Sequence, residues 1–311
     1  MRVASPLSRP SDAVPGSPMN LLLLALVPAC FALNPVIGRA LAGQFGPATL
    51  SVVRFGLSAL IVALLVASLG KSERWQAPAA LIVRVGVLGM LGMGFCAFAA
   101  FEAARTTEAT NIGLIYGCTS AFVAVWEIAA GRQRARPMLG LGIAACLFGV
   151  ALILTKGHPG VLKDWAFTPG DLWAAAGMLV FVIYTVAMRR VPATMTPLAQ
   201  FTVMAVAATL VLLPVAGAEV AAAGWPPLHE RTLPWIAALV LLTGIGAYLG
   251  YNVSLKLNGP VLTSASICLT PVYAAVQAML LIGERLAWYH GVALLLVVAG
   301  LLLVNRAQQA K

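Results

Sequence analysis

Residues 79–101 read AALIVRVGVLGMLGMGFCAFAAF, a stretch in which Arg84 is the only charge. A helix needs about 20 continuous apolar residues to cross the hydrocarbon of a bilayer. Other stretches of this kind lie on both sides of it. They are continuously apolar and do not alternate, which predicts helices and excludes a strand barrel. These stretches are residues 19–38, 47–69, 109–130, 138–155, 171–188, 197–217, 234–254, 260–282 and 287–305.

The composition also places the chain in a membrane. Hydrophobic residues make up 61% of the 311 residues and charged residues 10%, with a mean hydropathy of +0.93. A soluble domain is about half apolar and about a quarter charged. The net charge of +10 does not predict a nucleic-acid partner, because the basic residues lie in short gaps between apolar runs.

The sequence disfavours two function classes of membrane proteins. A membrane enzyme would need clustered acid, base or metal-binding groups near the interface, and a channel would show polar rings or a filter. The loops are short and hold dispersed charges, and we therefore expect no enzyme activity. All five cysteines lie within apolar runs without metal-site spacing, so neither a metal nor another cofactor is expected. They are Cys30, Cys96, Cys118, Cys146 and Cys268.

Lys and Arg predict the orientation, since cytoplasmic segments of membrane proteins carry an excess of them. With the N-terminus inside, inner segments carry 13 of the 20 such residues, outer segments carry 6, and Arg54 lies within a run. We expect a multi-pass cell-membrane protein, of the inner membrane in a bacterium, with both termini cytoplasmic. Residues 1–18 should form a disordered tail before a retained first helix, and residues 307–311 a second tail. The expected partners are a small-molecule substrate and the lipid bilayer, with a monomeric protein.

The two halves of the chain resemble each other. A shift of 152 residues superimposes Gly92 on Gly244 and Gly94 on Gly246. These glycines allow close packing of two related helices, or alternatively a bending gate.

The repetition predicts how the chain is organised. We expect five-helix repeats at residues 19–156 and 170–306, joined by a linker at 157–169. Because five is odd, the second repeat starts from the opposite side of the membrane. The predicted fold class is thus all-α integral membrane, with ten transmembrane helices as two inverted repeats, an arrangement typical of secondary transporters.

The late part of the second repeat carries a family resemblance. Leu269-Thr270-Pro271-Val272 is followed by an apolar run, then by Gly283-Glu284, Gly291 and Gly300. This pattern resembles the drug/metabolite transporter superfamily in its ten-helix EamA form. Arg54-Phe55 is similar to the family's second-helix pattern, and Phe31, Asn34 and Arg39 to its first. Two residues depart from the family pattern, Thr119 in place of Pro and Arg132 in place of Glu.

The resemblance implies a carrier of small metabolites. Residues 250–271 look similar to the amino-acid exporting branch, which implies export of aromatic or other neutral amino acids. A permease for another class of metabolite or drug is the alternative.

Polar and aromatic residues near the centres of the runs give a candidate substrate cavity. Pro271 is expected to leave the carbonyl of Ile267 free, as a substrate contact or hinge, unless Ser266 or Thr270 satisfies it. Deep tyrosine hydroxyls are costly in lipid and should face the interior. Asn34 could bind a carboxylate or tie two helices together. The expected cavity residues are Asn34, Phe95, Phe98, Tyr116, Thr119, Ser120, Tyr184, Tyr248, Tyr251, Ser266, Thr270 and Pro271.

Charged residues within the runs suggest structural pairs. An unpaired guanidinium at the depth of Arg54 would cost at least about 2 kcal/mol, so Glu102 is its expected partner. Arg54 could instead attract an anionic group. Arg84 and Glu127 form the second expected pair, with snorkelling of these side chains to the interface as the alternative. No acidic residue falls at an apparent midplane, which predicts transport without proton coupling.

Overall fold

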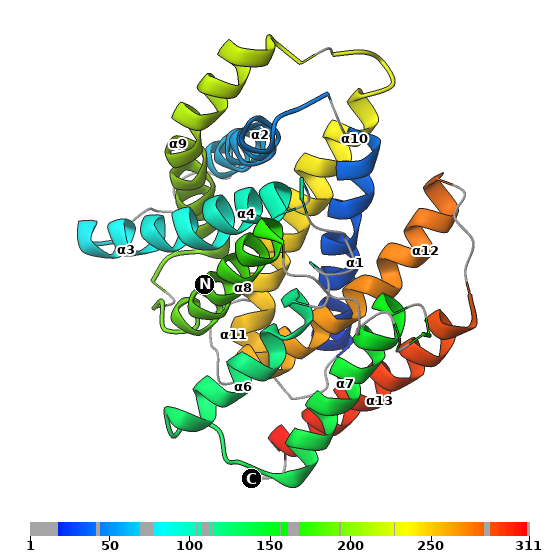
Figure 1. Ribbon diagram of the computed structural model, residues 1–311. Coiled ribbons are helices and arrows are strands. Elements are labelled where there is room, and N and C mark those ends of the chain that lie inside the picture. The colour runs from blue at the N-terminus through cyan, green and yellow to red at the C-terminus, as the bar shows by residue number, and fades with distance from the viewer. Residues whose placement is uncertain are drawn as a thin grey trace.

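The computed structural model describes most of the chain, and all regular structure in its described residues is helical (Figure 1). The expected N-terminal tail lies outside these residues apart from Pro18, as does most of the linker expected at 157–169. The described residues are 18–41, 44–68, 77–103, 105–106, 112, 115–155, 157–158, 160, 168–192, 194–226, 228–282 and 287–309.

The first half contains α1 (Pro18–Ala40), α2 (Pro47–Ser68), α3 (Ala79–Gly89), the π-helical η2 (Met90–Phe95), α4 (Cys96–Ala103), α6 (Thr119–Ala129) and α7 (Pro137–Leu154). Of these, α3, η2 and α4 form one continuous helix. The local sequence determines where these helices start. Three of them, α1, α2 and α7, begin at a proline, whose ring fixes a helical φ at a position that needs no intrahelical N–H donor.

The second half contains α8 (Pro169–Met188), α9 (Pro197–Ala223), α10 (Leu233–Ala238), the π-helical η4 (Leu239–Gly246), α11 (Ala247–Ser266), the 3₁₀ turn η5 (Ile267–Leu269), α12 (Thr270–Ile282) and α13 (Trp288–Gln309). Here α8 begins with a capping box in which Asp171 N donates to Thr168 Oγ1 at 3.3 Å. Since α13 reaches Gln309, residues 307–309 of the expected C-terminal tail are helical.

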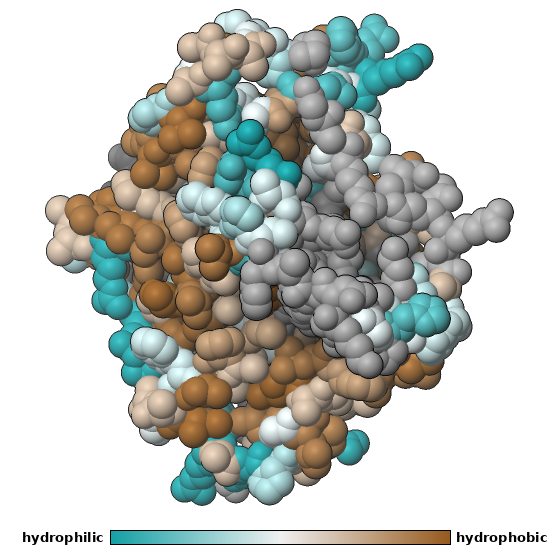
Figure 2. All heavy atoms as spheres, in the orientation of Figure 1, coloured by the Kyte–Doolittle hydropathy of each residue, from teal (hydrophilic) through white to brown (hydrophobic). Residues whose placement is uncertain are grey.

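Seven helical stretches among the described residues are long and apolar enough to cross a membrane, so this is a multi-pass membrane protein. They are Met19–Gly38, Pro47–Ser68, Ala79–Ala103, Pro169–Met188, Pro197–Ala223, Leu233–Leu281 and Trp288–Ala307, and shorter apolar helices lie at Ile115–Ala129 and Pro137–Leu152. Figure 2 shows brown side chains across much of the visible face, with teal gathered by the segment joining α9 to α10 and by the turn between α6 and α7.

The stretch Leu233–Leu281 changes direction at Gly259. Gly259 has φ 76° and ψ 168°, a conformation that glycine adopts without steric cost. Pro260 follows and lacks an N–H, so the helix cannot continue across this point with its normal hydrogen bonds. The break lies at the gap predicted between residues 254 and 260, although the first helix extends to residue 258.

Helix packing repeats between the two halves. The second helix of each half packs along the other, α2 on α9, and the last helices do the same, α7 on α13. The helix α4 lies on α8, while its counterpart α11 lies on α1. Likewise α6 contacts α8 while α12 contacts α1. Each contact made by a helix of one half thus has an equivalent made by the corresponding helix of the other half. The helix packing therefore repeats as the sequence does.

Both halves contain a π-helical segment at the same place. Gly92 lies in η2 and Gly244 in η4, the pair that the 152-residue shift superimposes. In a π-helix the hydrogen bonds run from i to i+5, which widens the helix, and such segments often occur at functional sites. The two segments therefore mark equivalent positions for closer inspection.

Candidate functional site

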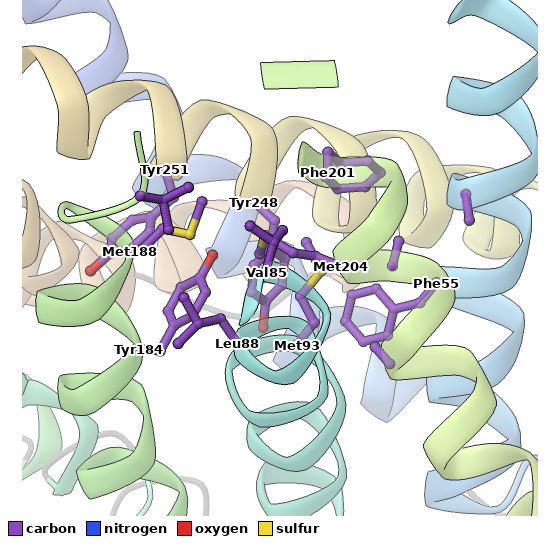
Figure 3. Close-up of a cluster of buried hydrophobic side chains, with 14 of the residues drawn as sticks. Phe55, Val85, Leu88, Met93, Tyr184, Met188, Phe201, Met204, Tyr248 and Tyr251 are labelled. Carbon is purple, nitrogen blue, oxygen red and sulfur yellow. The ribbon is translucent and has the colours of Figure 1, made fainter. Parts of the chain in front are cut away.

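Aromatic side chains from three helices meet in the middle of the molecule. We call Phe31 of α1, Phe181 and Tyr184 of α8, and Tyr248 and Tyr251 of α11 the aromatic core. The Phe31 and Tyr248 ring centroids lie 5.2 Å apart, as do those of Phe181 and Tyr251. Figure 3 shows the three tyrosines converging with methionines of neighbouring helices. In this segment a shift of 150 residues places Phe31 on Phe181, so the core lies where the two halves meet.

The tyrosine hydroxyls of the aromatic core bond to partners inside the protein. Tyr184 Oη donates to Asn252 Oδ1 at 2.6 Å, and Tyr251 Oη lies 2.8 Å from Thr185 Oγ1. Both tyrosines are fully buried. Tyr184 therefore faces the interior, as expected from its depth, and a polar network runs within an apolar surrounding.

Gly92 of η2 lies against two of these rings. Its carbonyl accepts from Tyr248 Oη at 3.1 Å, and a Cβ at this position would overlap the ring of Tyr184. The absence of a side chain lets the π-helical segment approach the core closely. Gly92 thus joins the third helix of one half to α8 and α11 of the other.

Arg54 of α2 points into the same region. The side chain is only 2% exposed, and its Nη2 donates to the carbonyl of Thr243 in η4. Its Cζ lies 4.9 Å from the Phe55 ring centroid and 5.3 Å from that of Tyr248. Nε has no acceptor. One turn along α2, Ser58 Oγ donates to the carbonyl of Val240, also in η4, at 3.0 Å.

The charge pairs expected from the sequence are replaced by others. Glu102 binds Arg105 at 3.1 Å, and among the described residues no carboxylate reaches Arg54. Glu102 and Arg105 are three residues apart at the end of α4, so Glu102 binds this local partner and not Arg54.

The acid expected to pair with Arg84 also has different partners. Glu127, which is 1% exposed, binds Arg189 at 3.0 Å and Arg132 at 3.4 Å, whereas Arg84 is exposed. Since Arg189 ends α8, the pair connects the two halves at one side of the molecule. Arg132, one of the two residues that depart from the family pattern, is thus part of this cluster.

One further acid serves a helix start. Glu219 of α9 accepts from the backbone N–H groups of Ala48 and Thr49, at 3.0 and 2.8 Å, and from Thr49 Oγ1 at 2.8 Å. A carboxylate at a helix N-terminus satisfies free N–H groups and complements the helix dipole. The sequence alone did not indicate this role.

The fourth and ninth predicted helices are interrupted at equivalent levels and touch there. Cys118 forms a turn before α6, and η5 precedes α12. Ser120 Oγ lies 3.7 Å from Cys268 Sγ across this contact. Thr119 Oγ1 turns back to the carbonyl of Tyr116 at 2.6 Å. The structure thus brings Ser120 together with the segment before Pro271.

The carbonyl of Ile267 is not free, which agrees with the second of the two alternatives for Pro271, that Thr270 satisfies this carbonyl. The N–H of Thr270 donates to it in a tight 3₁₀ turn. Ser266 Oγ donates instead to the carbonyl of Thr263 at 2.8 Å. Pro271 has no N–H to donate to the carbonyl of Ile267. The tighter 3₁₀ turn before it lets the N–H of Thr270 donate to that carbonyl instead.

Three buried oxygens between α1 and α12 have no partner among the described residues: Asn34 Oδ1, Thr270 Oγ1 and Gln277 Oε1. Gln277 Nε2 donates to the carbonyl of Ala29 at 2.9 Å, which fixes that amide. Buried polar atoms normally have partners, so these oxygens mark a place where a donor is missing.

Phe95 and Phe98 lie apart from the aromatic core. They pack against Trp173, at centroid distances of 6.2 and 5.8 Å. Both also line a cavity of about 330 Å³ whose other lining residues are Val87, Met90, Leu91, Val211 and Leu212. This lining is entirely apolar and suits lipid or an apolar group, not a polar substrate.

Tyr116 contacts both neighbouring helices. Its hydroxyl donates to the carbonyl of Cys96 at 3.3 Å, and a Cβ on Gly177 would overlap that hydroxyl. Cys96 Sγ lies 3.3 Å from the carbonyl of Gly177. Tyr116 therefore ties the fourth helix to α4 and α8.

Sequence reasoning missed several residues of the region. Asn252, Thr185 and Gln277 each hold a tyrosine or a backbone carbonyl in place. Asn252 and Gln277 could have been found as amides inside apolar runs, since such residues usually hydrogen-bond across helices. Nothing in the sequence indicated Thr243, because Arg54 binds its backbone carbonyl and not its side chain.

Comparisons with known proteins agree with this architecture. The model of the EamA-like transporter family matches twice, at residues 18–155 and 168–306. A solved crystal structure described only as that of a protein superimposes with a TM-score of 0.72 over 94% of this chain and 98% of its own, at 18% identity. At this identity the likeness speaks for the fold alone. Curated protein sequences gave no match.

Proposed function

The chain belongs to the EamA-like transporter family, a family of membrane transporters of small molecules, and we propose that it exports amino acids, aromatic or otherwise neutral, by alternating access. Members of this family are transporters and not enzymes.

We propose ten membrane crossings in two inverted repeats. At 1.5 Å per residue, the 49 residues of Leu233–Leu281 would extend about 74 Å, far beyond the roughly 30 Å of hydrocarbon. The left-handed backbone at Gly259 supports a division of this stretch into two crossings. With Ile115–Ala129 and Pro137–Leu152 as short crossings, each half has five.

The observation that carries the proposal is the pairing of irregular segments at equivalent positions. η2 and η4 flank the aromatic core from the two halves, and the interruptions before α6 and α12 touch through Ser120 and Cys268. Interrupted helices near the junction of two repeats are where secondary transporters bind substrate. Aromatic rings and hydroxyls suit a small amphipathic molecule.

The positions and partners of the described acidic side chains support transport without proton coupling. Among the described residues Glu102 and Glu127 pair with arginines, and Glu219 caps α2. None of these carboxylates lies in the aromatic core, where a proton relay would be needed.

Counterflow in proteoliposomes tests the proposal. Vesicles preloaded with unlabelled phenylalanine or leucine should accumulate the labelled amino acid saturably, with or without a pH gradient. Tyr184→Phe removes the hydrogen bond to Asn252 and should raise the half-saturation concentration severalfold, while Tyr289→Phe, in α13 beside Trp288, serves as control. Strict dependence on a pH gradient would contradict uncoupled transport. No counterflow with any amino acid would discard this substrate class.

A further inference from the structure

Arg54 is a buried cation whose charge the described residues leave without an anion. Its polar contact is a neutral carbonyl, that of Thr243, and its other neighbours are the rings of Phe55 and Tyr248. Within the described part of the chain, no carboxylate lies within ion-pair distance. Nε has no acceptor among the described residues.

Such an arrangement is costly for a structural residue. A guanidinium inside a membrane protein normally pairs with an anion, because desolvation of its charge outweighs one hydrogen bond to a neutral group. Contacts with aromatic faces compensate only part of this cost. A residue whose sole task was to join α2 to η4 could be neutral, as Ser58 is one turn further along the same two elements.

We infer that the missing anion is the substrate's carboxylate, which binds the Arg54 guanidinium. This inference rests on the proposed function and specifies the chemistry of its substrate. Guanidinium presents several N–H donors in one plane, which matches the two oxygens of a carboxylate. One buried positive charge is neutralised by one negative charge, so the substrate is a monocarboxylate and not a dianionic phosphate ester.

The surroundings of Arg54 explain how such a substrate is enclosed. Phe55 and Tyr248 cover the guanidinium, and the Tyr248 hydroxyl is held by the carbonyl of Gly92 from the other half. The carboxylate reaches Arg54 when this contact opens. An apolar or aromatic side chain of the substrate then lies against the rings of the aromatic core.

The test compares ligands that differ at the carboxylate. Phenylalanine, its carboxamide and the corresponding hydroxy acid would compete against counterflow of labelled phenylalanine, and their effects on thermal unfolding of the purified protein would be measured in parallel. In the wild type, the two carboxylates should bind about tenfold or more tightly than the carboxamide, as expected for a charge-assisted hydrogen bond.

Three variants separate charge from structure. Arg54→Gln keeps a donor for the Thr243 carbonyl but removes the charge, and should bring the carboxylate-to-carboxamide ratio close to one. Arg54→Lys should retain part of the preference. Ser58→Ala removes the neighbouring hydrogen bond to η4 without changing any charge, and should leave the ratio as in the wild type.

Each outcome bears on a different statement. An unchanged ratio in Arg54→Gln, or a wild type that does not prefer the carboxylates, overturns the role of Arg54 while leaving a transporter in place. If Arg54→Gln cannot be purified, the carboxylate-to-carboxamide ratios of the wild type and of Arg54→Lys test the role of Arg54 instead. A wild type that neither transports nor is stabilised by any of the ligands refutes the proposed substrate, and this inference with it.

Discussion

Replacing Gly92 by alanine is the most direct test of how η2 packs on the aromatic core. A Cβ at this position would overlap the Tyr184 ring, which is fully buried and cannot swing into solvent. Either the ring or η2 must move. We expect Gly92→Ala to destabilise the protein and to reduce transport.

The magnitude follows from three contributions. Overpacking costs about 1–3 kcal/mol. Displacing Tyr184 weakens its hydrogen bond to Asn252, for about 1 kcal/mol. Alanine in place of glycine gains about 1 kcal/mol of helix propensity. The net loss is about 1–3 kcal/mol, which corresponds to a fall in the unfolding temperature of roughly 2–12 °C for a chain of this size.

Gly86→Ala is the matched control on the same helix. Its Cβ would meet Ala207 Cβ at 3.7 Å, an ordinary contact, so the variant should be as stable as the wild type or slightly more stable. Fluorescence-detected size-exclusion chromatography after heating measures both variants in detergent.

A double variant ties the effect to the ring. On a Tyr184→Ala background, where the ring is missing, Gly92→Ala should cost nothing further, because two residues in contact are not additive. If Gly92→Ala proves as stable as Gly86→Ala, or costs the same with and without the ring, the packing described for η2 is wrong.

Two further predictions concern contacts between the halves. Glu127 is buried and its two arginines are partly exposed, so Arg132→Gln or Arg189→Gln alone should lower the free energy of unfolding by less than about 1 kcal/mol. The double variant leaves a buried carboxylate unpaired and should lower it by about 3 kcal/mol. Additive effects of the two substitutions in thermal unfolding would contradict this. Ser120→Cys should form a disulfide with Cys268 upon mild oxidation, since the native atoms lie 3.7 Å apart. With Cys118 and Cys146 replaced by serine, a protease site introduced within residues 161–167 would reveal the cross-link as a single band on a non-reducing gel, and two bands would show that the segments do not meet.

Several features of the fold were predictable from the sequence because they depend on neighbours along the chain. Continuous apolar runs predicted the helices, and prolines at positions such as 47, 137 and 169 start them. Gly259-Pro260 divides a long helical stretch within the predicted gap. The internal repeat indicated which glycines are equivalent, and both lie in π-helical segments.

The candidate site was only partly predictable. The depth of Tyr184 and Tyr248 in their runs correctly indicated that these side chains face the interior, because a hydroxyl in lipid is costly. The same argument could not indicate their partners. Phe95 and Phe98 lie at similar depths, yet they line an apolar cavity away from the core.

The sequence by itself thus determined that this is a multi-pass helical membrane protein with an internal repeat, because hydropathy and repetition are properties of the chain alone. Only the tertiary structure decided that Arg54 faces a carbonyl of η4 and not Glu102, and that Glu127 binds Arg189 from the other half. The physical reason is that such contacts depend on the rotation and crossing of packed helices. Those are fixed by many side chains fitting together across distant parts of the chain.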